Sequence, residues 1–138
     1  MNGYAQDLFD AINGQRAENG VPALVLDSCV VYVAQVRSDD MAARNYFSHT
    51  DPNEGPEASA LAFRLLDKFG VPHGWAGENL ARNNYPDGET VAVSIRDLMA
   101  SPDHRANILS THYTAMGVAM ADDGNGMKYF TMIFVGPP

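Results

Sequence analysis

Cysteine and basic residues are scarce in this sequence, and each shortage argues against a class of protein. Cys29 is the only cysteine, so the chain can form no internal disulfide and no thiolate metal cluster. Because Cys29 lies among Val30, Val31 and Val33, we predict that it is a small, apolar-like thiol in the core. Lys and Arg number 9 against 17 Asp and Glu, and the net charge is -8. This balance predicts no nucleic-acid partner, because phosphate backbones are bound by clustered basic residues.

Long hydrophobic runs are also missing. No apolar stretch approaches the roughly 20 residues that a membrane-spanning helix needs, and the given N-terminus has no charged and apolar secretory leader. We therefore predict no membrane span, and the oligomeric state stays open. The remaining composition, with 46% hydrophobic and 19% charged residues, is ordinary for a folded soluble protein. A length of 138 residues predicts one domain over 1–138 with a single core.

Helical spacing of apolar residues is the main signal in the first two thirds of the chain. It predicts helices over about 4–19, 28–44, 58–69 and 91–99. Asp27 or Ser28 is suited to cap the second of these helices. Ser101 and Pro102 predict the N-cap and first position of a further short helix, where the missing N–H of proline costs nothing.

The period changes in the last third. Segments 113–121 and 127–135 are rich in aromatic, Thr, Val and Met residues and are separated by the turn sequence Asp122–Gly126, which predicts a β-hairpin. Residues 75–81 are predicted to be a further extended segment. Helices followed by a terminal hairpin predict an α+β protein, with helices packed on an antiparallel sheet.

Glu78 is the strongest candidate for a functional residue. It lies within Gly77–Leu80, a run of small and apolar residues that is otherwise expected to be buried. A buried carboxylate without a partner costs several kcal/mol or is forced to take up a proton. His49, in the loop after the second predicted helix, is the obvious candidate partner.

Motifs along nearly the whole chain carry a family resemblance. They are Asn13, Arg16, Gly20, Leu24, Leu26, Met41, His49, the Gly77–Leu80 segment, the Ser101–Arg105 segment, His112 and Gly117. Together they resemble the CAP superfamily, which comprises cysteine-rich secretory, antigen 5 and pathogenesis-related-1 proteins and is also called the SCP domain family, in its short bacterial form. The resemblance implies a three-layer α-β-α sandwich with a central antiparallel sheet. It also implies a location outside the cell or in the cell envelope.

The resemblance further implies a site. In this family two histidines and two acidic residues line a central cavity, and His49, Glu78 and His112 match three of those positions. The fourth position departs from the family pattern, because Leu98 replaces the helical Trp that precedes the second glutamate and Ser101 falls near the acid.

Three residues near this missing acid are further candidates. His104, within Ser-Pro-Asp-His-Arg, is typical of bacterial members, and we expect it to face the same cavity. Asp103 and Asp97 are poorer substitutes for the absent glutamate. The predicted binding cavity therefore comprises His49, Glu78, His104 and His112.

Three functions remain open at this point. The favoured one is a binding domain that takes a small apolar ligand, a peptide or a divalent cation such as zinc, with His49 and His112 as the metal ligands. The alternative is a metal-assisted, peptidase-like hydrolase in which Glu78 acts as general base and His49 and His112 are also catalytic. The sequence has no HExxH motif and no Gly-x-Ser-x-Gly elbow, so binding is favoured over catalysis. In the third, the polar cluster is purely structural and the surface binds a partner protein.

Overall fold

The computed structural model describes residues 2–55 and 57–138, which form five helices and four strands. The helices are α1 (Gly3–Glu18), α2 (Ser28–Arg44), α3 (Leu61–Lys68), α4 (Thr90–Ala100) and α5 (Pro102–Leu109), and the strands are β1 (Val25–Leu26), β2 (Trp75–Asn83), β3 (Ala115–Asp122) and β4 (Lys128–Gly136). The predicted helices and the predicted hairpin are confirmed. The third helix is shorter than expected, since it begins at Leu61.

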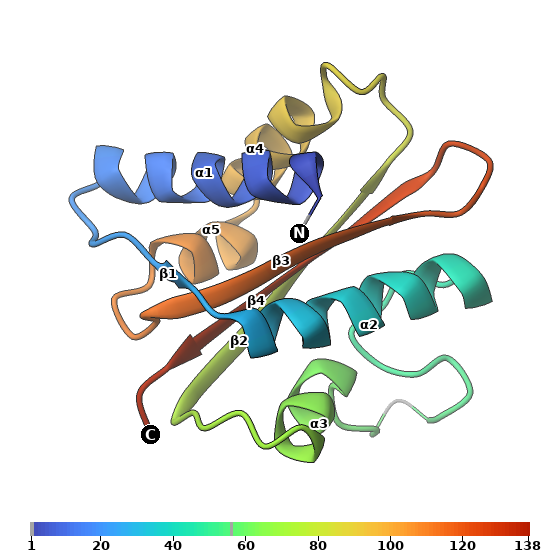
Figure 1. Cartoon of the computed structure of the whole chain (residues 1–138), viewed down its shortest axis with the longest axis horizontal. Helices are drawn as coiled ribbons and strands as arrows, with labels where there is room; N and C mark the ends of the chain where they lie inside the picture. The colour runs from blue at the N-terminus through green and yellow to red at the C-terminus, as the bar shows by residue number, and fades with distance from the viewer. Residues whose placement is uncertain (1, 56) are drawn as a thin grey trace.

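The strands form one sheet between two layers of helices (Figure 1). Their order is β1-β3-β4-β2, with β2, β4 and β3 antiparallel and the two-residue β1 parallel to β3. Helices α2 and α3 cover one face, and α1, α4 and α5 cover the other. The α-β-α sandwich is therefore confirmed. Strand β1 escaped the sequence analysis because two residues are too short to show a period.

The complete burial of strand β4 explains why the second half of the hairpin sequence shows no polar face. Every one of its residues is buried, since it is an inner strand with helices on both sides. Phe130, Met132 and Phe134 pack against the α1, α4 and α5 layer. Ile133 and Val135 alternate with them and pack against α2 and α3. Alternation along the strand thus divides one apolar run between two cores.

The start of α2 confirms one prediction and corrects another. The Oδ1 atom of Asp27 accepts hydrogen bonds from the backbone N–H groups of Cys29 at 2.8 Å and Val30 at 3.2 Å, which is an N-cap. The prediction that Cys29 lies in the core is wrong, because this side chain is exposed. Helix α2 turns Val30 and Val33 toward the sheet, whereas Cys29, in its first turn, is left exposed to solvent.

Arg16 joins distant parts of the chain at one end of the sandwich. Its buried guanidinium donates to the carbonyl oxygens of Pro22 at 2.8 Å, Ile108 at 2.8 Å and Ser110 at 2.9 Å. Helix α1 is thereby fixed to the end of α5 and to the segment that leads into β3. Within the described residues, every helix is too short or too polar to cross a bilayer.

Gly117 marks the closest approach of α2 to the sheet and gives a test of this packing. A Cβ atom at residue 117 would overlap with the backbone of Val30 and Val31, which cannot move without displacing the helix. We expect Gly117→Ala to lower the free energy of unfolding by about 3 kcal/mol, as overpacking does. Urea denaturation followed by circular dichroism measures this change.

Gly14→Ala is the matched control. A Cβ atom there meets nothing within 4 Å, and alanine in the middle of α1 should raise stability by about 0.5–1 kcal/mol. Equal stabilities of the two variants would contradict the close packing of α2 on β3.

Candidate functional site

A buried ion pair between β2 and α2 forms the centre of the candidate site. The side chain of Glu78 is 2% exposed and that of Arg37 is 1% exposed. Arg37 binds both carboxylate oxygens, with Nε 3.0 Å from Oε2 and Nη2 3.2 Å from Oε1. Glu78 lies on the face of β2 that α2 and α3 cover, where the long arginine side chain reaches it. The sequence therefore places two opposite charges in the interior, and each compensates the other.

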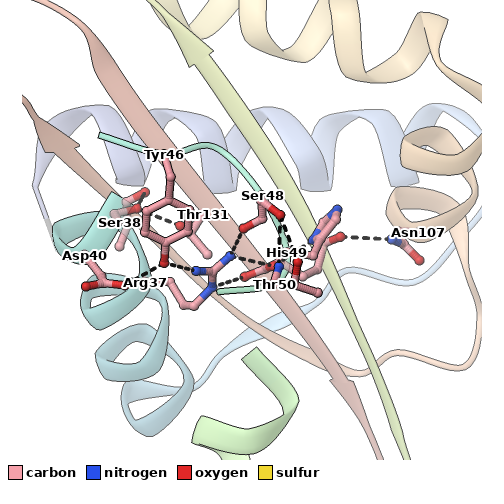
Figure 2. Close-up of polar contacts among 11 residues, drawn as sticks. Arg37, Ser38, Asp40, Tyr46, Ser48, His49, Thr50, Asn107 and Thr131 are labelled. Carbon is pink, nitrogen blue, oxygen red and sulfur yellow. Dashed lines mark hydrogen bonds and ion pairs between the residues drawn. The ribbon is translucent and has the colours of Figure 1, made fainter. Parts of the chain in front are cut away.

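Arg37 makes two further hydrogen bonds through its terminal nitrogens, as Figure 2 shows. Nη1 donates to the hydroxyl of Tyr46 at 2.8 Å, and Nη2 donates to the carbonyl of Ser48 at 2.6 Å. The Tyr46 hydroxyl in turn donates to Asp40 at 2.6 Å. Burial and the hydrogen bond to Asp40 raise the pKa of Tyr46 to about 12. Burial alone would lower the pKa of Arg37, but its contacts with Glu78 and Tyr46 raise it overall.

This network fixes the loop that carries His49. The Nδ1 atom of His49 lies 2.8 Å from Oε1 of Glu78. The carboxylate can only accept, so Nδ1 donates, and in the neutral ring Nε2 is then left as an acceptor. The His49 side chain is 49% exposed, in contrast to its buried partner. One end of the imidazole is thus fixed in the interior and the other is accessible.

A cavity of about 310 Å³ opens beside His49 at the edge of the sheet. It is lined by His49, Ala60, Phe63, Ala76, Gly77, Glu78, Asn107 and Tyr113. Because β2 is the edge strand, side chains from both layers meet around it. A Cβ atom at Gly77 would overlap with the hydroxyl of Tyr113, so glycine is needed for this approach. Burial raises the pKa of Tyr113.

Asn107 links the α5 side of the cavity to β2. Its Nδ2 atom donates to Oδ1 of Asn79 at 2.8 Å and lies 3.5 Å from the carbonyl oxygen of Glu78. Its Oδ1 atom accepts from the Tyr113 hydroxyl at 3.4 Å. The wall opposite Phe63 is therefore built from amide and hydroxyl groups.

Of the four residues predicted for the cavity, the structure brings His49 and Glu78 into contact. His104 is instead 2.8 Å from the Ser101 hydroxyl, through Nδ1, and lines a neighbouring cavity. The exposed ring of His112 stacks on Trp75, with ring centroids 3.6 Å apart and planes 8° apart, and is not among the residues that line the cavity at His49.

The two acids considered as substitutes for the family's second glutamate also lie apart from Glu78. Asp97 lines the same neighbouring cavity as His104. Asp103 is exposed in the first turn of α5. Among the residues that the structure describes, neither Asp97 nor Asp103 therefore joins the pair formed by His49 and Glu78.

The residues around Glu78 offer little to a metal ion. Within residues 2–55 and 57–138, no group of three or more His, Cys, Asp and Glu side chains is arranged to hold one. Both oxygens of Glu78 already accept hydrogen bonds from Arg37 and His49. A zinc site made of His49 and His112 stays a prediction, and no step of chemistry is derived through it.

Arg37 is a charged residue of this site that was not predicted from the sequence, although the sequence contains a signal for it. Val33, Arg37 and Met41 follow one another at intervals of four residues, which places them on one face of the helix. An arginine on an otherwise apolar face requires a buried acceptor. The sequence had already indicated that Glu78 is a buried acid, so Glu78 was the candidate acceptor for Arg37.

Comparison with known proteins agrees with this architecture. The model of the Cysteine-rich secretory protein family (CAP) matches residues 9–134, and the chain belongs to this family. YkwD, an uncharacterized protein of Bacillus subtilis (strain 168), is 29% identical over 136 residues, which are 99% of this chain and 48% of YkwD. The chain therefore spans about half the length of that relative.

Solved structures show the same fold. An extracellular protein containing an SCP domain from Bacillus anthracis str. Ames is 30% identical with a TM-score of 0.81, over 98% of this chain and 41% of that one. An outer surface protein from Borrelia burgdorferi has a TM-score of 0.82 at 16% identity, over 98% of this chain and 93% of that one. These likenesses agree with the CAP fold of this chain.

Removal of Arg37 tests whether the ion pair is required. Arg37→Met leaves the Glu78 carboxylate buried without its counter-charge, so we expect it to lower the free energy of unfolding by about 3–5 kcal/mol. The double variant Arg37→Met/Glu78→Gln should recover part of this loss, because no uncompensated charge remains. Chemical denaturation of both variants at pH 7 measures the difference.

Arg44→Met is the control on the same helix. Arg44 pairs with Asp40 and Asp51 at the surface, where solvent screens the charges, so its loss should change stability only slightly. If Arg37→Met behaved like Arg44→Met, the buried pair would not hold β2 and α2 together.

Proposed function

We propose that this chain is a CAP-family binding domain, and that the cavity beside His49 takes a short peptide or another small, partly apolar ligand. The observation that carries the proposal is the state of Glu78, whose two oxygens are engaged by Arg37 and His49. A carboxylate in this position orients the imidazole. It is poorly placed to take a proton from a substrate, because it would first have to release one of these partners.

The lining of the cavity supports a ligand with both apolar and polar groups. Ala60, Phe63 and Ala76 offer apolar surface, and His49, Asn107 and Tyr113 offer hydrogen-bonding groups. The volume of about 310 Å³ lies at the lower end of the range for small-molecule sites. A peptide fits this chemistry, since its side chain can contact Phe63 while its amide N–H groups donate to Nε2 of His49.

Hydrolysis is the alternative, and one observation favours it. A histidine that donates Nδ1–H to a buried carboxylate has the orientation of a general base. A hydrolase would also need a nucleophile, and within the described residues His49 is hydrogen-bonded to no hydroxyl or thiol group. The neighbouring Ser48 hydroxyl lies 3.2 Å from that of Thr50 instead. Water held by a metal is the remaining nucleophile.

The place of action is proposed from relatives. One similar protein is described as extracellular and another as an outer surface protein. We propose, with the support of these relatives, that the domain acts outside the cell or in the cell envelope.

Phe63 allows a test with a matched control. We use acetyl-Ala-Phe-Ala-amide as an uncharged peptide probe and follow ¹H–¹⁵N spectra during titration. Binding should shift the signals of Gly77, Asn107 and Tyr113, and Phe63→Ala should weaken binding by about tenfold, through loss of roughly 1.5 kcal/mol of apolar contact. Phe69→Ala is the control, because Phe69 is similarly exposed, at 42% against 38% for Phe63, but packs on Tyr32 outside the cavity.

Loss of affinity in both phenylalanine variants, or in neither, would argue against this cavity as the binding site. His49→Ala should also weaken binding, because the acceptor Nε2 is removed.

Incubation with ZnCl₂ separates binding from hydrolysis. For a binding domain, we expect mass spectrometry to recover the same peptide uncleaved after incubation with zinc. Cleavage that disappears in both His49→Ala and Glu78→Gln would establish the hydrolase. Calorimetry with ZnCl₂ measures zinc binding directly. If the His49→Ala/His112→Ala variant still takes up zinc, these two residues are not the zinc ligands.

A further inference from the structure

A second cavity lies farther along β2 and involves neither His49 nor Glu78. It has a volume of about 220 Å³ and is bordered by residues 80–83 of β2, by Phe47 and by side chains of α4 and α5. The first cavity borders residues 76–78 of the same strand. Any ligand of the second cavity would therefore meet a different set of groups.

Arg82 is a cation in this cavity without an acceptor. The other arginines bind carboxylates, backbone carbonyls or, for Arg105, a side-chain amide oxygen. In the part of the chain that the structure describes, Arg82 makes no hydrogen bond or ion pair through its side chain. Its guanidinium carbon lies 4.9 Å from the ring centroid of Phe47 and 5.8 Å from that of Tyr129. Arg82 is exposed, so its guanidinium lies beside the two rings and its N–H groups are available to a ligand.

A second donor comes from the wall formed by α5. Ser101 occupies the N-cap position of α5 but makes no side-chain cap hydrogen bond, and its hydroxyl lies 2.8 Å from Nδ1 of His104. When this hydroxyl donates to Nδ1, the neutral ring carries its proton on Nε2. Nε2 has no partner among the described residues. His104 can therefore donate a hydrogen bond to a ligand in the cavity, beside Arg82.

The other walls define the rest of the ligand. Leu80 and Leu98 border the cavity but are only 6% and 3% exposed, so Phe47, which is 39% exposed, provides the apolar surface that a ligand can contact. Asp97 also borders it and pairs with Arg96 at 3.2 Å. A carboxylate at this border repels further negative charge, which favours a singly charged ligand over a dianion.

We propose that this second cavity binds a small monocarboxylate with an apolar body. The carboxylate accepts hydrogen bonds from the guanidinium of Arg82 and from Nε2 of His104, and the apolar body lies against the ring of Phe47. The planar fork of arginine matches the two oxygens of a carboxylate. In a chain with a net charge of -8, an arginine with no acidic partner marks a place where an acid can bind without competing with an internal ion pair.

N-acetyl-L-leucine and its neutral amide test the proposal on the unmodified chain. We expect the acid, followed by ¹H–¹⁵N spectra, to shift the Arg82 side-chain Nε–H signal and the backbone signals of Ser101 and His104. The amide should bind at least about tenfold more weakly, because a charge-assisted hydrogen bond contributes roughly 1.5–3 kcal/mol. Equal binding of acid and amide, or no shift of these signals at millimolar acid, would overturn the proposal.

Variants separate the role of Arg82 from general electrostatics. Arg82→Gln should weaken binding of the acid by about tenfold or more. Arg105 is an exposed residue of α5 outside the cavity, so Arg105→Gln should leave the affinity for the acid unchanged. Equal losses in both variants would overturn the proposal. If Arg82→Gln fails to fold, Arg82→Lys can be used instead. It keeps the positive charge but lacks the planar guanidinium, so we still expect weaker binding of the acid.

Two further arms distinguish the ligand and the cavity. Inorganic phosphate should produce smaller shifts than the acid, and equal or larger shifts would overturn the assignment of a monocarboxylate. His49→Ala should not change binding of the acid, because His49 lines the other cavity. A loss of acid binding in His49→Ala would place the ligand in the first cavity and overturn the inference, while leaving the proposed function intact.

Discussion

The pairing of Arg37 with Glu78 is the interaction on which the candidate site depends. It joins α2 to the edge strand β2 inside the protein, with both side chains almost completely shielded from water. Buried ions are tolerated only when their charges and hydrogen-bonding groups are satisfied. Here Tyr46, the Ser48 carbonyl and His49 complete the set. In the described part of the chain, no buried side-chain nitrogen or oxygen lacks a partner.

This constraint explains why the two cavities described above lie along one edge of the sheet. The three residues from Tyr46 to Ser48 are held by Arg37 or face Arg82, so the loop after α2 is drawn against β2. Helix α5 approaches the same strand from the other face through Asn79 and Asn107. The two layers thus meet beyond the last strand, and polar groups from both become neighbours there. An edge strand between two helical layers gives room for ligands without opening either hydrophobic core.

Much of the fold could be predicted from local sequence. The spacing of apolar residues gave the helices, and Asp27 and the Asp122–Gly126 turn marked where elements begin and end. Cys29 was assigned to the wrong environment because its apolar neighbours suggested a core, whereas a helix turns adjacent residues to different sides. Asn13 bonds both backbone groups of Leu24, the residue before β1, and such a contact between separate segments leaves no periodic signal.

The sequence by itself determined that Glu78 is a buried acid in need of a partner, and that His49 is one, because burial follows from local composition. Only the tertiary structure decided that Arg37 is the main counter-ion, that His104 lies with Ser101 and that His112 stacks on Trp75. These outcomes depend on which face of β2 each side chain meets. Strand alternation sends residues 75 and 78 to opposite faces, and how the two layers close around that edge is fixed by packing over the whole chain.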